Sequence, residues 1–129
     1  QQPEEHKEEQ DTYEQFLVKK DVQFIEKIHQ VIEENLDNSD FNIDTIASTI
    51  GLSRSAFFKK LKSLTGFAPV DLVKEIRLNK SIELIKNSDM SISEIAFAVG
   101  FKDSGYFSKC FRKKYDQTPR EYMNEWRKG

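Results

Sequence analysis

The 129-residue sequence predicts an all-α fold in which two helix-turn-helix units flank a long linker helix. Three observations support this prediction. No stretch shows the strict alternation of apolar and polar residues that is typical of a half-buried strand. From Thr12 onward, apolar residues recur instead at steps of three and four, which is the period of an amphipathic helix. The chain also contains two similar stretches about 50 residues apart, and each has the pattern of a helix-turn-helix unit.

The chain begins with an acidic segment and continues as a series of helices. Residues 1–11 are almost free of apolar side chains, so we interpret residues 1–20 as an acidic linker or tail that contains the start of a helix. Residues 21–129 are expected to form one domain. Its first helix, over residues 21–38, carries an apolar stripe of Val22, Ile25, Ile28, Ile32 and Leu36. Six later helices are expected. The first five have a start and a stop residue each, in chain order Asn42 and Gly51, Ser53 and Gly66, Pro69 and Asn87, the Ser91–Glu94 capping box and Gly100, and Ser104 and Tyr115. Thr118 starts the sixth helix.

The two similar stretches align residue by residue. The first, IASTIGLSRSAFFKKLKSLTGFAPVDLV, begins at Ile46, and the second, IAFAVGFKDSGYFSKCFRKKYDQTPREYM, begins at Ile95. The spacing is 49 residues up to the shared glycine and 50 beyond it, so the turn of the second copy holds one extra residue. Two copies in register are far harder to obtain by chance than one. We therefore expect helix-turn-helix units over about residues 43–66 and 92–116, joined by a linker helix over residues 70–87.

Helical geometry separates a buried face from an outward face on the second helix of each unit. At about 100° per residue, Phe57, Leu61 and Leu64 share the buried stripe of the first unit. Phe107 and Phe111 form that of the second. The outward faces combine small, polar and cationic side chains, namely Ser55, Phe58, Lys59 and Lys62 in the first unit and Gly105, Ser108, Lys109 and Arg112 in the second. Such faces suit the DNA major groove, because cations neutralise phosphates and small residues approach base edges closely. The alternative is that each face carries Lys and Arg only because it is exposed to solvent. The presence of the same kind of face in both units makes this alternative less favourable.

The charge is divided unevenly along the chain. Residues 1–52 carry four Lys or Arg and 13 Asp or Glu, whereas residues 53–129 carry 16 and nine. This asymmetry points to a polyanionic partner for the second part only.

Two residues of the outward faces each have two possible interpretations. Phe58 either flanks the core or contacts a thymine methyl group, and Gly105 either permits close approach to DNA or adjusts the start of its helix.

The expected linker helix has two apolar stripes instead of one. They consist of Leu72, Val73 and Ile76 in its first half and of Leu78, Ile82 and Ile85, on another side, in its second half. We therefore expect the first half to pack on the first unit and the second half on the second unit. At ~1.5 Å per residue the helix spans roughly 25 Å. That length suits the placement of two helices in major-groove segments about 34 Å apart.

Little in the sequence supports an enzyme. The motifs GxSxG and HExxH and a Gly-rich phosphate loop are absent. His6 and His29 lie far apart and Cys110 lies beside a buried stripe, so we expect neither a metal site nor a cofactor. A helical protein-interaction module is the more serious alternative to DNA binding, but it leaves the duplicated cationic faces unexplained. RNA binding is less favoured, because the aromatic residues lie on buried stripes and form no stacking platform.

Residues from about Asp21 to Arg127 resemble the DNA-binding domain of the AraC/XylS family of bacterial transcription regulators. The resemblance is carried by IASTIGLSRSAFFKKLKSLTGFAP, by IRLNKSIELIKNS and, most specifically, by SISEIAFAVGFKDSGYFSKCFRKKYDQTPREYM. It implies a homeodomain-like fold in which one monomer reads two successive major-groove segments. The base contacts that it implies are Ser55, Phe58, Lys59, Ser104, Gly105, Ser108 and Lys109. Four further residues resemble phosphate contacts, which position a protein without reading sequence, and these are Arg54, Lys62, Lys102 and Arg112.

Three residues depart from the family's pattern. Asp116 stands where glycine is usual, Ser81 replaces an alanine of the linker helix, and Lys109 stands where arginine is common. At this last position, the lysine ammonium is a point charge, whereas an arginine guanidinium can form two parallel hydrogen bonds with one partner.

The helix FIEKIHQVIEENLDNSDFNIDTIA and the acidic segment before it are similar to the C-terminal output domain of hybrid two-component proteins of Bacteroidetes-type bacteria. This resemblance implies three partners: double-stranded DNA, RNA polymerase, and the receiver and sensor domains of a longer polypeptide. Dimerisation is expected through those further parts. The resemblance also implies a transcription regulator, such as an activator, that works in the cytoplasm while its parent protein is anchored in the inner membrane.

Overall fold

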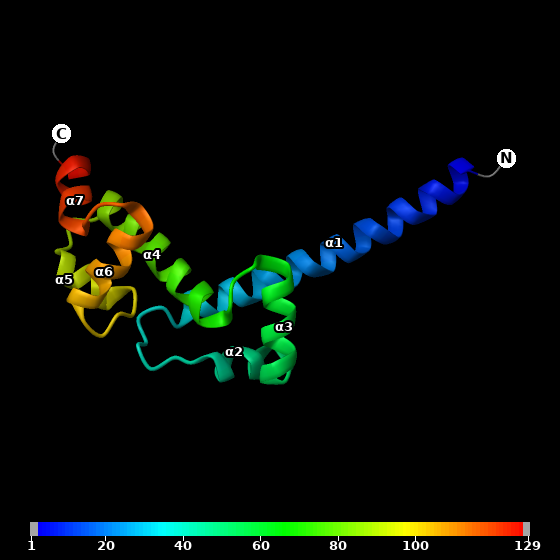
Figure 1. Ribbon diagram of the computed structural model, residues 1–129, viewed down its shortest axis with the longest axis horizontal. Helices are drawn as coiled ribbons and strands as arrows, with labels where there is room; N and C mark the ends of the chain where they lie inside the picture. Colours follow the sequence, from blue (N-terminus) through cyan, green and yellow to red (C-terminus); the bar gives the residue numbers. More distant parts are fainter. Residues whose placement is uncertain (1–2, 128–129) are drawn as a thin grey trace.

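A computed structural model describes the backbone of residues 3–127 and the side chains of residues 12–127. The described backbone forms seven helices and no strand, which confirms the all-α prediction. Figure 1 shows α4 running through the middle of the molecule, with α2 and α3 near one end and α5, α6 and α7 near the other. The helices are α1 (Pro3–Glu34), α2 (Ile43–Ile50), α3 (Arg54–Thr65), α4 (Pro69–Asn87), α5 (Ile92–Ala98), α6 (Ser104–Tyr115) and α7 (Pro119–Arg127).

Helix α1 is longer than the sequence predicts. It begins at Pro3, so the acidic residues before Thr12 continue the helix, and its first half projects away from the other helices (Figure 1). Only the second half packs on the domain, where Phe24, Ile28 and Ile32 are buried. Val22 was expected in the same stripe but is 48% exposed, because α1 begins to pack on the domain only after this residue.

The internal repeat is confirmed by burial and by backbone geometry. The paired residues Phe57 and Phe107 are fully buried, and so are Leu61 and Phe111. The extra residue of the second copy lies in its turn, since residues 52–53 separate Gly51 from α3 and residues 101–103 separate Gly100 from α6. The two units therefore share one architecture and differ in the turn that leads into the second helix.

Most predicted caps form hydrogen bonds. The Ser53 side chain accepts from the backbone N–H of Ala56, and Asn42 accepts from that of Thr45. Ser91 and Glu94 form both bonds of a capping box. The segment before α7 forms the same reciprocal pair between Thr118 and Glu121. These side chains satisfy N–H groups that have no partner within the first turn of a helix.

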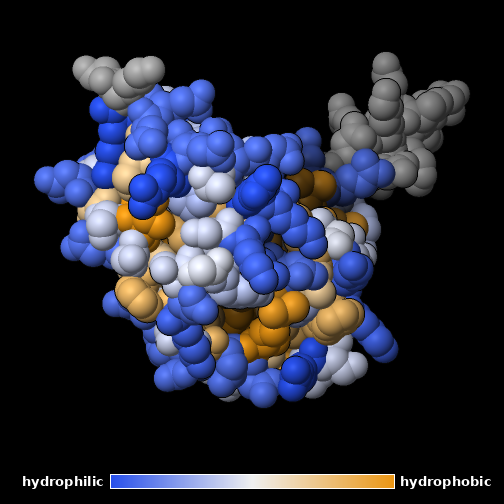
Figure 2. Space-filling model, turned by 60° about the vertical axis from the view of Figure 1, so that its left-hand side comes forward, coloured by the Kyte–Doolittle hydropathy of each residue, from blue (hydrophilic) through white to orange (hydrophobic). Residues whose placement is uncertain are grey.

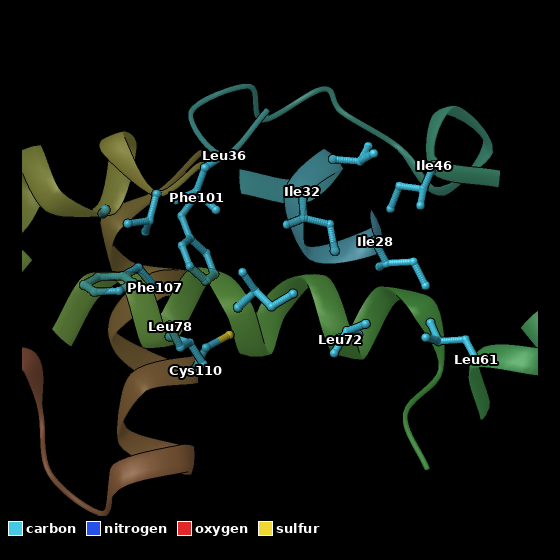
Figure 3. Packing of buried hydrophobic residues seen from close by; sticks show 14 of the residues in the cluster. Ile28, Ile32, Leu36, Ile46, Leu61, Leu72, Leu78, Phe101, Phe107 and Cys110 are labelled. Atoms are coloured by element: carbon cyan, nitrogen blue, oxygen red, sulfur yellow. The ribbon is translucent and has the colours of Figure 1, made fainter. Parts of the chain in front are cut away.

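The two stripes of α4 are confirmed as contacts with different units. Figure 3 shows Leu72 near Ile28, Ile32 and Leu61, whereas Leu78 lies near Phe107 and Cys110. Both leucines are buried, as is the thiol-bearing Cys110. Ser81 is buried too, and its hydroxyl donates to the Leu78 carbonyl oxygen at 2.6 Å. One helix thus packs on both units and joins them through a single buried cluster.

Leu64 does not follow its predicted burial. It lies on the same helical stripe as Phe57 and Leu61, yet it is 39% exposed. The last turn of α3 extends past the surface on which the helix packs, and Gly66 then ends the helix. Periodicity gives the direction of a side chain but not the point at which its supporting surface ends.

Candidate nucleic-acid interface

The outward face of α3 is accessible along its whole length. Residues Phe57 and Leu61 anchor the helix in the core, and the opposite side is exposed. All five residues that the sequence singles out on this helix are exposed, namely Arg54, Ser55, Phe58, Lys59 and Lys62. Phe58 is 47% exposed. Its ring is accessible to a ligand, and both interpretations, a position that flanks the core and a contact with a thymine methyl group, stay predictions.

Helix α6 presents an equivalent face in the second unit. Phe107, Cys110 and Phe111 hold it in the core. Of the predicted contact residues on this helix, Gly105, Lys109 and Arg112 are exposed and Ser104 and Ser108 are half-buried, while Lys102 is exposed in the turn before it. We call α3 and α6 the reading helices, because each combines a buried anchor with an outward face of small and cationic side chains.

Gly105 has a structural reason to lack a side chain. The Asp103 carboxylate caps α6 and accepts from the Gly105 N–H at 2.6 Å. A Cβ at position 105 would lie 3.1 Å from that carboxylate oxygen, which is tighter than an ordinary van der Waals contact. The helix-start interpretation of Gly105 thereby gains a specific cause. The residue is also exposed, so close approach of DNA at this position remains compatible with the structure.

Two cations near the N-terminal ends of the reading helices already have carboxylate partners. Arg54 Nε lies 3.6 Å from Asp44 Oδ1, and Lys102 Nζ lies 3.2 Å from Asp40 Oδ1. All four side chains are largely exposed, and such surface pairs contribute only ~0–1 kcal/mol. A phosphate group can therefore replace either carboxylate at little cost. The acidic loop before α2 and the start of α2 thus modulate the charge of this face.

Sequence reasoning missed Lys74 and Tyr106, which meet between the two units. Lys74 lies on α4 and Tyr106 on α6, and the Lys74 Nζ is 5.7 Å from the centre of the tyrosine ring. A hydrogen bond to Tyr106 raises the pKa of Lys74 above its ordinary value, while burial opposes that rise. The signal in the sequence was slight: a cation beside the first apolar stripe of the linker helix and a tyrosine at the edge of an outward face.

Other kinds of site find no support in the part of the chain that the structure describes. Among residues 12–127, no group of three or more His, Cys, Asp or Glu side chains is arranged to hold a metal ion. No described helix is long and apolar enough to cross a membrane.

Residues 46–125 match the family of helix-turn-helix domains. A transcriptional regulator from Chromobacterium violaceum, described as containing an AraC-type DNA-binding domain, superposes with a TM-score of 0.74 at 28% identity. The superposition covers 80% of this chain and 91% of that one. The chain belongs to the AraC-type helix-turn-helix family. AraC-type domains are DNA-binding transcription regulator domains and are not enzymes.

Two further relatives of this AraC-type domain are parts of signalling proteins. The C-terminal domain of the two-component response regulator yesN from Fusobacterium nucleatum is 31% identical, with a TM-score of 0.69, over 76% of this chain and 95% of that one. Histidine kinase P4 of Formosa agariphila is 38% identical over 106 residues, which is 82% of this chain. The chain spans only 8% of the length of that kinase.

Proposed function

We propose that this AraC-type domain binds a specific double-stranded DNA site by inserting its two reading helices into successive major-groove segments. The observation that carries the proposal is the duplicated outward face: α3 and α6 are anchored in the same way and present the same kinds of side chain. Because α4 packs on both units, the reading helices keep a fixed separation. A rigid pair of reading helices selects a site in which two short motifs have a defined spacing.

The residues divide into two expected roles. The candidates for base contacts are Ser55, Phe58, Lys59, Ser104, Gly105, Ser108 and Lys109. The candidates for phosphate contacts are four further cations: Arg54, Lys62, Lys102 and Arg112. Base contacts give specificity, whereas phosphate contacts give affinity that depends on salt.

We also propose that the domain is the output of a two-component signalling protein. Two relatives support this, since this chain resembles the C-terminal domain of the two-component response regulator yesN and a segment of a histidine kinase. The receiver and sensor parts of the same polypeptide would then control the domain and supply dimerisation. RNA polymerase is the expected partner in activation, and the acidic segment before Gly51 is a candidate for contact with the polymerase or with a receiver domain.

Selection of bound duplexes from a random DNA pool tests the DNA-binding proposal. We expect enrichment of two short motifs about one helical turn apart. Insertion of five base pairs between the motifs turns them to opposite sides of the duplex, so it should remove most of the affinity, whereas the same insertion outside the motifs should not. Titration at several salt concentrations should give a steep negative slope of log affinity against log salt. Absence of enrichment, with no binding at low salt, would overturn the proposal in favour of a helical protein-interaction module.

The signalling proposal needs the complete protein in its own host. We expect a Lys59→Ala change in the chromosomal copy to abolish signal-dependent transcription from promoters that contain the selected site. A signal response that survives this change, in a protein that has lost DNA binding in vitro, would contradict the output role.

A further inference from the structure

A hollow of about 560 Å³ lies between the two helix-turn-helix units. Its lining comes from the loop before α2, the start of α3, the first half of α4 and the start of α6, and includes Phe41, Arg54, Val73, Lys74 and Tyr106. Apolar side chains form much of its wall. Figure 2 shows an apolar depression of this kind in the lower half of the molecule, bordered by hydrophilic side chains.

The hollow faces the side on which DNA would lie. Arg54 is the first residue of α3, and Asp103 is the N-cap of α6, so the N-terminal ends of both reading helices border the same space. In helix-turn-helix proteins, the N-terminal residues of the reading helix contact base edges. Between two successive major-groove segments, a duplex presents its minor groove and the sugar-phosphate strands beside it. Those strands would pass over the hollow.

Lys74 differs from the other cations at the edge of this hollow. Arg54 and Lys102 each pair with a carboxylate, and the buried Arg77 donates to two backbone carbonyl oxygens. Among the described side chains, none of the ion pairs involves Lys74. Its ammonium lies 5.7 Å from the centre of the Tyr106 ring, and interactions with this tyrosine and with the Asp71 carboxylate raise the pKa of Lys74. A half-buried cation that belongs to none of the described ion pairs, in a hollow bordered by both reading helices, has charge available for a phosphate.

We propose that Lys74, held beside Tyr106 in this hollow, binds a backbone phosphate of the DNA between the two major-groove segments. The inference rests on the proposed function and adds a contact from the linker helix to those of the reading helices. The apolar wall strengthens the contact, since an attraction between charges increases where less water surrounds them. A phosphate contact at this point would fix the spacing of the two half-sites without reading a base.

The salt dependence of binding to the selected duplex tests the contact. We expect Lys74→Gln to reduce the slope of log affinity against log salt by about one unit. The matched control is Lys80→Gln, since Lys80 lies on the same helix but pairs with Glu83 at 3.7 Å and does not line the hollow. The control should keep the wild-type slope. Circular dichroism melting of both variants verifies that they fold.

Neutral methylphosphonate linkages locate the phosphate. Substituted one at a time between the two motifs, they should weaken binding of the wild-type protein at one or two positions. At one of those positions, the neutral linkage should not weaken DNA binding by the Lys74→Gln variant. Lys80→Gln should be weakened at the same positions as the wild-type protein. An unchanged slope for Lys74→Gln, or equal sensitivity of Lys74→Gln and wild type at every position, would overturn this inference while leaving the proposed function intact. Failure of the wild-type protein to select any duplex would instead overturn the proposed function itself.

Discussion

The Arg77 guanidinium occupies the space that a side chain at Gly100 would need. A Cβ at position 100 would lie 1.5 Å from Arg77 Nη1 and 2.2 Å from the Leu36 carbonyl oxygen. The guanidinium donates to the carbonyl oxygens of Val99, at 3.2 Å, and of Asn38, at 3.3 Å. Arg77 is buried in α4. It therefore connects the linker helix to the turn of the second unit and to the loop that follows α1.

Replacement of Gly100 by alanine should consequently be severe. The backbone at this position has φ +94°, which strains any L side chain, and the new methyl group would displace Arg77. We expect a loss of about 3 kcal/mol or more in the free energy of unfolding. Urea denaturation followed by circular dichroism measures this loss.

The first unit supplies a matched control for this prediction. Gly51 has φ +85°, but a Cβ there would have no atom within 4 Å. Gly51→Ala should therefore cost only the backbone strain, about 1–2 kcal/mol. Equal losses for the two variants would show that the contact with Arg77 contributes nothing.

The Asp44 carboxylate should weaken DNA binding, because it neutralises Arg54 and repels phosphate. We expect Asp44→Asn to raise affinity for the selected duplex several-fold at low salt, with a smaller gain at high salt. Fluorescence anisotropy with a labelled duplex measures the change. Asp37→Asn is the control, since Asp37 lies on the loop that leads from α1 to α2 and belongs to none of the described ion pairs. An equal gain for both variants would indicate a general effect of net charge instead of release of Arg54.

Lys109 and Arg112 should respond differently to truncation, although they are neighbours on one helix face. If Lys109 contacts a base, Lys109→Ala costs about 1–3 kcal/mol and the loss depends on the base at one position of the site. Arg112→Ala should instead weaken binding to all sequences alike and reduce the salt slope by about one unit. Binding measured against a panel of single-base variants separates the two roles. A uniform loss for Lys109→Ala would assign this lysine to a phosphate.

Much of this arrangement could be predicted from sequence, because it depends on periodicity and on local caps. The repeat placed Phe57 and Phe107 in equivalent buried positions, and the two stripes of α4 predicted its double packing. Arg77 escaped prediction, since its partners lie 22 and 39 residues away and are backbone carbonyl groups. The contact of Lys74 with Tyr106 was missed for the same reason, because nothing local relates α4 to α6.

The Tyr115 phenol should make stability fall at high pH. Burial and, to a lesser extent, the Glu75 carboxylate raise the pKa of Tyr115 to about 12. In the unfolded chain the phenol titrates near its ordinary value of about 10. Between these values the unfolded state loses its proton first, so the free energy of unfolding should decrease from about pH 10 to pH 12 and should not change on this account below pH 10.

A Tyr115→Phe variant isolates this contribution from other groups that titrate in alkali. It loses the hydrogen bond that the phenol donates to Asn79 Oδ1 at 3.1 Å, so it should be about 1 kcal/mol less stable at neutral pH. Its decrease from pH 10 to pH 12 should nevertheless be shallower than that of the wild type. Parallel stability curves for the two proteins over this range would contradict the prediction.

Asp116 ends α6 in a conformation that favours glycine. Its φ is +61°, and it is the one non-glycine residue with positive φ in the described part of the chain. Glycine is the residue that most often adopts this conformation after a helix, and aspartate tolerates it better than most other residues do. Asp116→Gly should therefore stabilise the domain, by about 0.5–1 kcal/mol, through relief of steric strain at the Cβ. Thermal unfolding should show a midpoint a few degrees higher. Asp116→Ala removes the same charge but keeps the Cβ, so it should not stabilise. A similar gain for both variants would trace the effect to charge instead of to backbone geometry.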